Sequence, residues 1–590
     1  MTYDRRLIED SLPLEIISEQ SAREKSIRHG HISTLHIWWA RRPLAAMRAA
    51  IFASLIPAPK DDAERAKLHE LIGAIVNWDS VKNGNNSRVE EARTLIRKHY
   101  PDAPPKVLDP FMGGGSTGLE TLRLGAEAHG VELNPVAYLI QLCTLVYPQK
   151  YGQPKTVYAA PEPEQAEIPG MEKPKQPAQM ILDLQHGDST VIKNPLAADV
   201  RKWGMWVLEE SRKEIGHLYE DPEGRNIVGY LWARTAKCPN PMCRADIPMV
   251  RQWWLSKTGR RKAATRMVVN KATKSYRFEV VEGNEIDFDP DEGTMRQGSV
   301  MCPVCGQIPP EDYLREQGMA QKLGAIPMVV VFERDSSGKG FRAITDADKI
   351  IFDQARDVLA ELEDTNPDLV PTEAVSQEQP RIVWVTLYGL DQWFKLFNIR
   401  QLASLMTFSA KIRQAHQAIL NDTNDENYTL AIMTYLAMMF DRLANQSNTL
   451  SRWNNAGEKI EGVYARQAIP MVWDYVEGSP FSGATGDWLS ALEWVIRVIE
   501  HCSKSSPFSA SLRQGTATRL LINDGFLEAV ITDPPYYDAV PYSDLSDFFY
   551  VWLKRNVGDL YPDIFRTPLT PNGQKKTDYN VPHKSDNEIA

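Results

Sequence analysis

Hydrophobic and polar residues recur along the chain in patterns that predict several helices. After Pro43, apolar residues return at helical spacing over residues 44–55, so we expect a helix there. Residues 60–100 predict a second, more polar helical stretch, and residues 380–505 have the same periodicity with many Leu, Met and Trp. The N-terminal and central parts of the chain are therefore expected to be largely helical.

The pattern changes at Lys106. A short apolar strand at residues 107–108 is followed by a glycine cluster at 113–115, by a helix over 117–124 and by a second strand over 126–133. A strand, a helix and a strand in this order are typical of a parallel crossover. We expect this segment to begin an α/β sheet.

Three further stretches differ in character from the helical regions. Residues 230–330 alternate apolar and polar side chains and predict a small β-rich module. Residues 527–532 predict a buried strand, and residues 545–554 predict an amphipathic helix behind it. Six prolines within residues 151–180 favour an extended linker.

Length and composition set the scale of the protein. A chain of 590 residues with 43% hydrophobic and 24% charged residues predicts a globular protein of about three to four domains. We divide it into residues 1–150, the N-terminal helices and the first half of an α/β domain; 151–180, a linker; 181–230, a connecting segment; 231–330, the β-rich module; 331–510, a helical region; and 511–590, the second half of the α/β domain.

Charge and hydropathy argue against two classes of protein. The net charge of −10 argues against a uniformly basic nucleic-acid coat, although it leaves room for a local basic face. The longest near-apolar run, residues 428–440, is too short to span a bilayer, and the N-terminus lacks the apolar core of a signal peptide. We expect a soluble cytoplasmic protein with no membrane partner.

Four of the six cysteines form two close pairs, Cys238-x4-Cys243 and Cys302-x2-Cys305. Four thiolates carried on two turns are typical of a closed tetrahedral zinc site, although the 58 residues between the pairs exceed the common ribbon spacing. We predict a structural zinc ion that holds the β-rich module together.

A glycine-rich loop follows the first strand of the α/β unit. Gly113, Gly115 and Gly118 fit the spacing G-x-G-x-x-G, which lets the backbone approach a ligand at a helix N-terminus. Glu132 ends the second strand, where an acidic side chain can accept hydrogen bonds from both ribose hydroxyls of an adenosine. A tight turn and a solvated surface glutamate are the alternative interpretations.

A second loop, Asp533-Pro534-Pro535-Tyr536, follows the strand predicted at residues 527–532. Its prolines have no N–H, so the loop offers only acceptors, the Asp533 carboxylate and the Pro534 carbonyl. The exocyclic amine of a nucleobase needs such acceptors, and the Tyr536 ring can stack on a base that has left its helix. A bare turn is the alternative.

Together these blocks resemble the amino-group, S-adenosylmethionine-dependent DNA methyltransferases. DPFMGGGST with VELNP resembles motifs I and II of that family, TDPPY resembles motif IV, and HIWWARRPLAAMRAAI resembles motif X. More specifically, LPLEIISEQSAREKSIRHGHISTLHIWWARRP, the cysteine pairs, RQAIPMVWDYVEGSPFS and DPPYYDAVPYSDLSDFFYVWLKR resemble the zinc-ribbon-containing adenine-specific DNA methylases with a DUF1156-type N-terminus.

The resemblance implies a Rossmann-like methyltransferase sheet that is interrupted by a zinc-ribbon module and a helical region. Two segments are candidates for the motif that lies beside the adenine of the cofactor, Gly515-Thr516-Ala517 and Gly187-Asp188, and the choice between them stays open. By the same resemblance, the cofactor-binding residues are Asp109, Pro110, Phe111, Gly113, Gly115, Ser116, Thr117, Glu132 and Asn134, and the catalytic residues are Asp533, Pro534, Pro535 and Tyr536.

A strongly basic stretch lies between the cysteine pairs. Residues 237–277 contain 11 Lys or Arg and one acidic residue, interleaved with aromatic side chains. A solvated hairpin is the alternative interpretation, and the acidic loop at residues 282–292 could neutralise part of the charge. We predict contacts with DNA phosphates from Arg251, Arg260, Arg261, Lys262 and Arg266.

The expected function is methyl transfer to adenine N6 in DNA, which the resemblance links to restriction or phage-defence systems and their other subunits. The alternatives are a cytosine-N4 or RNA methyltransferase and a non-catalytic DNA-binding subunit. A complete sheet of this kind needs about three more strands after the second loop, and residues 556–590 contain no apolar strand. We therefore expect a truncated or split form that is weak or inactive without a partner chain.

Overall fold

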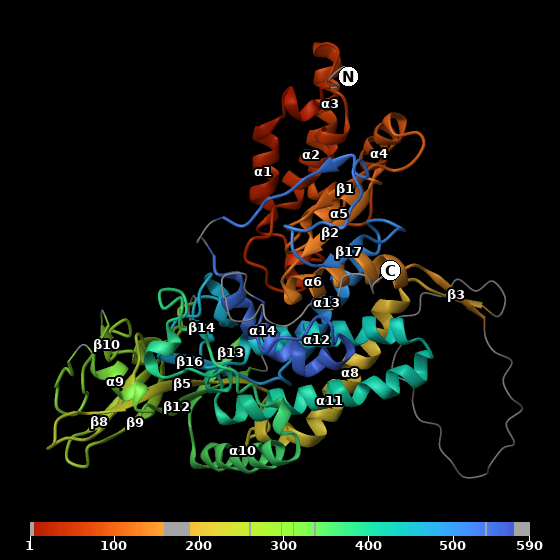
Figure 1. The fold of residues 1–590 in the computed structure, drawn as a ribbon. Coiled ribbons are helices and arrows are strands. Elements are labelled where there is room, and N and C mark those ends of the chain that lie inside the picture. The colour runs from red at the N-terminus through yellow and green to blue at the C-terminus, as the bar shows by residue number, and fades with distance from the viewer. Residues whose placement is uncertain are drawn as a thin grey trace, which may run out of the picture.

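The structure is a computed structural model that describes residues 5–158, 189–258, 261–296, 298–310, 312–334, 338–536 and 540–571. The fold is mixed α/β with several separate sheets (Figure 1). The upper half of Figure 1 contains the N-terminal helices and a parallel sheet, and the lower half contains a layer of long helices beside a β-rich part.

Four parallel strands form the first sheet, in the order β17-β2-β1-β18. Val107 pairs with Ala128 on one side and with Ala529 on the other. The helix α5 (Ser116–Arg123) joins β1 to β2, which confirms the predicted strand–helix–strand unit, and α6 (Pro135–Gln141) follows β2. The strands are β1 (Lys106–Asp109), β2 (Glu127–Glu132), β17 (Ser511–Gln514) and β18 (Ala529–Val530).

Four N-terminal helices pack beside this sheet. Their apolar side chains share one core with Val107 of β1 and with Leu124 and Ala126 near β2. Arg48 of the second helix is buried and forms an ion pair of 2.5 Å with Glu120 of α5, which ties the helices to the sheet. The helices are α1 (Leu14–Glu24), α2 (Leu44–Leu55), α3 (Asp62–Ile75) and α4 (Ser87–His99), so both helical predictions for this region are confirmed.

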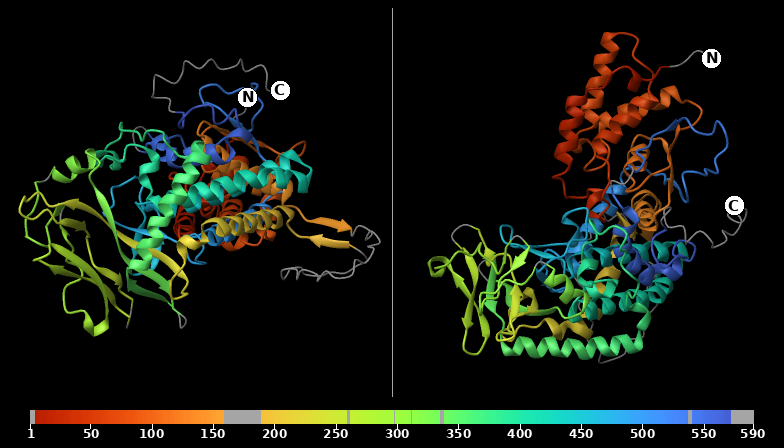
Figure 2. Two further views of the ribbon diagram at one scale, coloured as in Figure 1. Left: turned by 90° about the horizontal axis from the view of Figure 1, so that it is seen from below. Right: turned by 60° about the vertical axis from the view of Figure 1, so that its left-hand side comes forward.

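A layer of long helices lies on the other side of the sheet, as the right-hand view of Figure 2 shows. These helices and α6 share the largest apolar core of the described residues. The helix α14 follows the second loop and packs on α12 and α6, so it connects the helical layer to the parallel sheet. The members are α8 (Pro195–Ile215), α10 (Asp346–Thr365), α11 (Ile399–Thr423), α12 (Glu426–Gln446), α13 (Trp488–Cys502) and α14 (Tyr542–Val557).

The β-rich part contains a five-stranded antiparallel sheet and a three-stranded sheet, β7-β8-β9. In the larger sheet β5 is central and pairs with β12, β16 and β6. Since β16 comes from the central region, the segments 231–330 and 331–510 share one sheet. The strands are β5 (Ile227–Lys237), β6 (Asp246–Met249), β7 (Trp254–Ser256), β8 (Ala263–Asn270), β9 (Ser275–Glu282), β12 (Gly324–Glu333), β13 (Lys339–Ala343) and β16 (Asp474–Gly478).

The remaining α-helices and strands of the described chain are short. They are the helices α7 (Tyr147–Tyr151) and α9 (Tyr313–Met319) and the strand pairs β3 (Lys155–Tyr158) with β4 (Ser189–Ile192), β10 (Met295–Arg296) with β11 (Ser299–Val300), and β14 (Arg452–Asn454) with β15 (Lys459–Glu461).

Two predictions of secondary structure were wrong in part. The strand expected at 527–532 is only two residues long, and Val530 is 57% exposed because β18 lies at an edge of the sheet within the described chain. Residues 380–505 contain three strands besides their helices, and each strand is too short to interrupt a helical pattern taken over a long window. Residues 159–180 of the predicted linker lie outside the described residues.

In the part of the chain that the structure describes, no helix combines the length and the apolar character that crossing a membrane requires.

Candidate functional site

A cavity of about 790 Å³ lies where all four strands of the parallel sheet end. Loops at the carboxyl ends of neighbouring parallel strands are the usual ligand-binding region of an open α/β sheet. Each strand contributes residues that follow it, and the segment before α2 also lines the cavity. The lining is formed chiefly by residues 38–42, 109–114, 116–117, 132–134, 515–518, 533–536 and 540–544.

The glycine-rich loop after β1 lies directly against the segment before α2. A Cβ atom on Gly113 would lie 2.8 Å from the indole nitrogen of Trp38, and one on Gly114 would lie 2.8 Å from Nε of Arg41. Gly113 also has a φ of +52°, in the left-handed region that favours glycine. The loop needs glycine at these two positions because the neighbouring side chains occupy the space.

Glu132 connects the ends of β1 and β2. Its carboxylate accepts hydrogen bonds from the backbone N–H groups of Gly113, at 2.7 Å, and of Asn134, at 2.8 Å. Burial raises the pKa of the Glu132 carboxyl to about 7, although the two N–H donors act in the opposite direction. Asn134 caps α6 through its side-chain oxygen and donates to the Ser546 hydroxyl at 2.7 Å. Glu132 therefore holds the glycine-rich loop and also faces the cavity.

Because the pKa of Glu132 is raised, the free energy of unfolding depends on pH. The pKa is raised from 4.5 to about 7 in the folded protein, so this carboxyl favours folding below pH 4.5 and loses that contribution as the pH rises towards 7. The loss is at most about 3 kcal/mol. In Glu132→Gln this side chain does not titrate. We therefore expect the difference in melting temperature, variant minus wild type, to become more positive from pH 5 to pH 8. A difference that stays constant over this range would contradict this account.

Arg41 is a charged residue of the cavity that the sequence did not single out. Its Nε and Nη2 atoms are buried and have no hydrogen-bond partner among the described residues. Burial lowers the pKa of this guanidinium to about 10. Asp544, at the start of α14, also lines the cavity, is 4% exposed and has one carboxylate oxygen without a partner in the described chain. Buried polar atoms of this kind normally have partners, so both residues are candidates for ligand contacts.

The second loop also lines the cavity and places Asp533 and Tyr536 next to Arg42. The Arg42 guanidinium forms an ion pair with the Asp533 carboxylate and donates to the Tyr536 hydroxyl at 3.0 Å. The Tyr536 hydroxyl is 3.3 Å from the other oxygen of Asp533, and its side chain is largely exposed. Arg42 belongs to the block that resembles motif X, but it was not among the predicted site residues.

Apart from Gly115, the other predicted cofactor residues also line this cavity. Asp109 is buried, which raises the pKa of its carboxyl, while the Thr117 hydroxyl opposes that shift. Gly115 has a φ of +82° and forms the N-cap of α5. Gly515 to Ala517 line the cavity, whereas Gly187 and Asp188 lie outside the described residues. The remaining lining residues from the prediction are Pro110, Phe111, Ser116, Thr117, Pro534 and Pro535.

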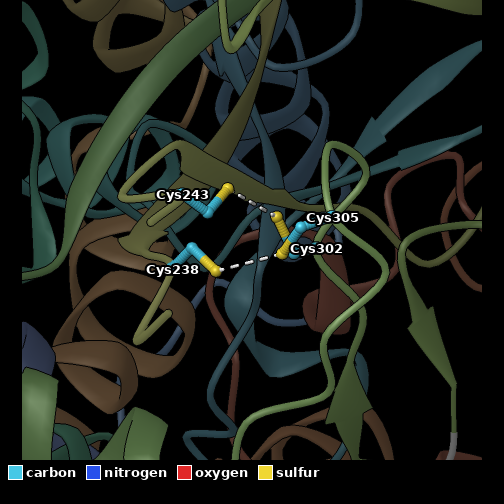
Figure 3. A group of neighbouring side chains, drawn as sticks. All are labelled: Cys238, Cys243, Cys302 and Cys305. Atoms are coloured by element: carbon cyan, nitrogen blue, oxygen red, sulfur yellow. Dashed lines mark hydrogen bonds between the residues drawn. The ribbon is translucent and has the colours of Figure 1, made fainter. Parts of the chain in front are cut away.

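The two cysteine pairs meet in the β-rich part (Figure 3). The four sulfur atoms all lie within 4.8 Å of one another, with 3.6 Å between Cys238 and Cys305 and 3.8 Å between Cys243 and Cys302. This confirms the predicted cluster, and the four thiols could hold one metal ion.

Several residues of the basic stretch are ion-paired. Arg251 pairs with Asp474 at 3.2 Å, and Arg266 pairs with Asp287 at 2.7 Å. Lys257 pairs with Asp291, so the acidic loop neutralises part of the charge, as predicted. Phosphate contact by this surface stays a prediction, and DNA would have to compete with these pairs.

The other three predicted residues of the basic stretch have different surroundings. The ammonium group of Lys262 lies 6.0 Å from the Trp254 ring centre, and the backbone N–H of Arg261 donates to the Thr258 carbonyl. Arg260 lies outside the described residues.

Comparison with known proteins supports one part of the resemblance. No curated protein and no solved structure matched the chain. Residues 11–72 match the family described as "Protein of unknown function (DUF1156)", and this range includes α1, α2 and most of α3. The chain therefore carries the DUF1156 segment that the sequence resemblance predicted.

Proposed function

We propose that the cavity binds S-adenosylmethionine and a nucleobase, and that the protein is a DNA adenine-N6 methyltransferase. One observation carries the proposal. The glycine-rich loop and Glu132 share a single cavity with Asp533 and Tyr536, although the two groups are far apart in the sequence. A volume of about 790 Å³ is within the range of small-molecule sites.

The residues present fit the cofactor. Glu132 has the position at the end of β2 from which a carboxylate accepts from ribose hydroxyls, and Gly515 to Ala517 after β17 would lie near the adenine. The methionine end carries a carboxylate and an ammonium group. Arg41 and Asp544 are of opposite charge, and their unpaired buried atoms suit these two groups. When bound, the cofactor supplies an electrophilic methyl group.

The second loop suits the methyl acceptor. Asp533 and the Pro534 carbonyl would accept hydrogen bonds from the two N–H groups of the target amine, which keeps its lone pair out of conjugation with the ring and lowers the cost of the charge that develops on nitrogen. The exposed ring of Tyr536 is available for stacking on an extruded base. Aspartate in this loop favours adenine over cytosine by the family resemblance.

The fold is consistent with the proposal. A parallel sheet with β1 between β2 and β18, and with its ligand cavity at the carboxyl ends, supports a Rossmann-like methyltransferase sheet. We further propose that the cysteine cluster holds zinc, because four thiolates form its preferred closed structural site. A role in DNA modification for restriction or phage defence is proposed from the sequence resemblance alone.

The nature of the modified base tests this function. Purified protein, in excess over nucleic acid so that slow transfer is detected, is incubated with labelled S-adenosylmethionine and separate DNA and RNA pools, and the nucleosides are then identified. We expect N6-methyladenine in DNA. Label in N4-methylcytosine or in RNA would replace the proposal by the second candidate, and DNA binding without any label would favour a non-catalytic subunit.

A further inference from the structure

Arg42 occupies the acceptor that the target amine would need. Its guanidinium contacts the Asp533 carboxylate through Nε and Nη2 and also reaches the Tyr536 hydroxyl. Its central carbon lies 5.5 Å from the centre of the Tyr536 ring. A guanidinium is planar and carries in-plane N–H donors, as the amine of adenine does. Arg42 therefore donates to the carboxylate that an incoming amine would use.

This contact opposes methyl transfer on electrostatic grounds. One carboxylate oxygen of Asp533 accepts from Arg42, and the Tyr536 hydroxyl lies near the other. In addition, positive charge beside Asp533 opposes the positive charge that develops on the target nitrogen during transfer. The guanidinium must leave Asp533 before the amine can use that acceptor.

The backbone of Arg42 is fixed, whereas its side chain can move. Its carbonyl oxygen accepts a hydrogen bond of 2.8 Å from the Ser116 hydroxyl at the start of α5, and Pro43 follows it immediately before α2. The side chains of Arg42 and Asp533 are 37% and 33% exposed, so the pair lies at the mouth of the cavity. An anionic group that approaches with the target base can therefore reach the guanidinium.

We propose that Arg42 switches partners: it pairs with Asp533, as in this structure, and transfers to a phosphate of the DNA when the target base enters. In this exchange the neutral amine replaces the guanidinium as the hydrogen-bond donor to Asp533, while the phosphate replaces Asp533 as the anion beside the guanidinium. Arginine is suited to this role because its guanidinium can bind either a carboxylate or a phosphate in bidentate geometry. The inference rests on the proposed function and deepens it.

The test uses two probes with the full chain saturated with S-adenosylhomocysteine. The first is 9-ethyladenine, which has the target amine but no phosphate, and the second is a short DNA duplex of mixed sequence. In Arg42→Met the internal competitor is absent, so we expect 9-ethyladenine to bind about fivefold more tightly. We expect the duplex to bind more weakly, with the slope of log affinity against log salt reduced by about one.

Two further variants keep the proposal falsifiable if Arg42→Met folds poorly. Arg42→Lys retains the charge and should retain the salt slope. Asp533→Asn releases Arg42 from its ion pair, so the duplex should bind more tightly. If Arg42→Met changed the affinities for both probes in the same direction, or changed neither, the role of Arg42 would be overturned and the proposed function would stay intact. A folded wild-type protein that fails to bind S-adenosylhomocysteine would count against the proposed function itself.

Discussion

Replacement of Asp533 by alanine is expected to abolish methyl transfer while cofactor binding persists. The variant lacks the carboxylate that accepts from the target amine, and loss of one such group in a transition state lowers rates by about 10² to 10⁴. The side chain of Asp533 is one-third exposed and contacts Arg42 and Tyr536 at the cavity mouth, so the fold should not depend on it. Single-turnover transfer to DNA and calorimetric titration with S-adenosylhomocysteine measure the two properties.

The chain offers a matched control for this variant. Asp563 is also an exposed aspartate that pairs with an arginine, Arg566, but it is not among the residues that line the cavity. Asp563→Ala should therefore transfer methyl groups at the wild-type rate. Asp533→Asn keeps one acceptor oxygen and should fall between wild type and Asp533→Ala. An unchanged rate in Asp533→Ala would show that the second loop is not the acceptor site.

Loss of the metal is expected to unfold the cysteine-containing part of the β-rich region. The cluster joins the end of β5 to the segment after β11, and the apolar core around it is small. In zinc-binding peptides the bound ion contributes about 10 to 16 kcal/mol of apparent binding free energy, more than such a core supplies. Cys302→Ser should therefore lose both the metal and the protection of this region against hydrogen exchange.

Metal analysis and hydrogen exchange check this prediction together. Wild type should contain about one zinc per chain, and a chelator should remove protection near β6 and β11 while the parallel sheet stays protected. Cys143→Ser is the control, because Cys143 is buried in the main apolar core and does not belong to the cluster. It should keep the metal even if it is less stable. A wild-type protein that folds fully without bound metal would contradict the prediction.

Local patterns predicted those parts of the site that lie within one stretch of sequence. The strand–helix–strand unit, its glycine-rich loop and Glu132 follow from apolar periodicity and from glycine spacing. The cysteine cluster was predictable because its four ligands form two close pairs along the chain. In contrast, β17 has four residues with little apolar character, and only pairing with β2 defines it as a strand.

The charged contacts of the cavity could not be predicted in the same way. Arg42 and Asp533 are 491 residues apart, and an arginine before a helix is usually solvated. Arg41 was missed because its lack of partners is a property of the folded chain alone. For the basic stretch, the sequence overstates the positive charge that is available to a ligand. The charge itself was evident in the sequence, but in the fold ion pairs such as Arg266 with Asp287 neutralise part of it.

Calorimetric titration with S-adenosylhomocysteine tests the central claim most directly, because it needs neither a recognition sequence nor turnover. Glu132→Ala removes the carboxylate that would accept from the ribose, and hydrogen bonds to charged groups are worth about 1.5 to 3 kcal/mol. We expect one binding site per chain in wild type and in Asp533→Ala, and affinity lower by about 10- to 100-fold in Glu132→Ala. No binding to folded wild type, or equal binding to Glu132→Ala, would contradict the assignment of the cavity to the cofactor.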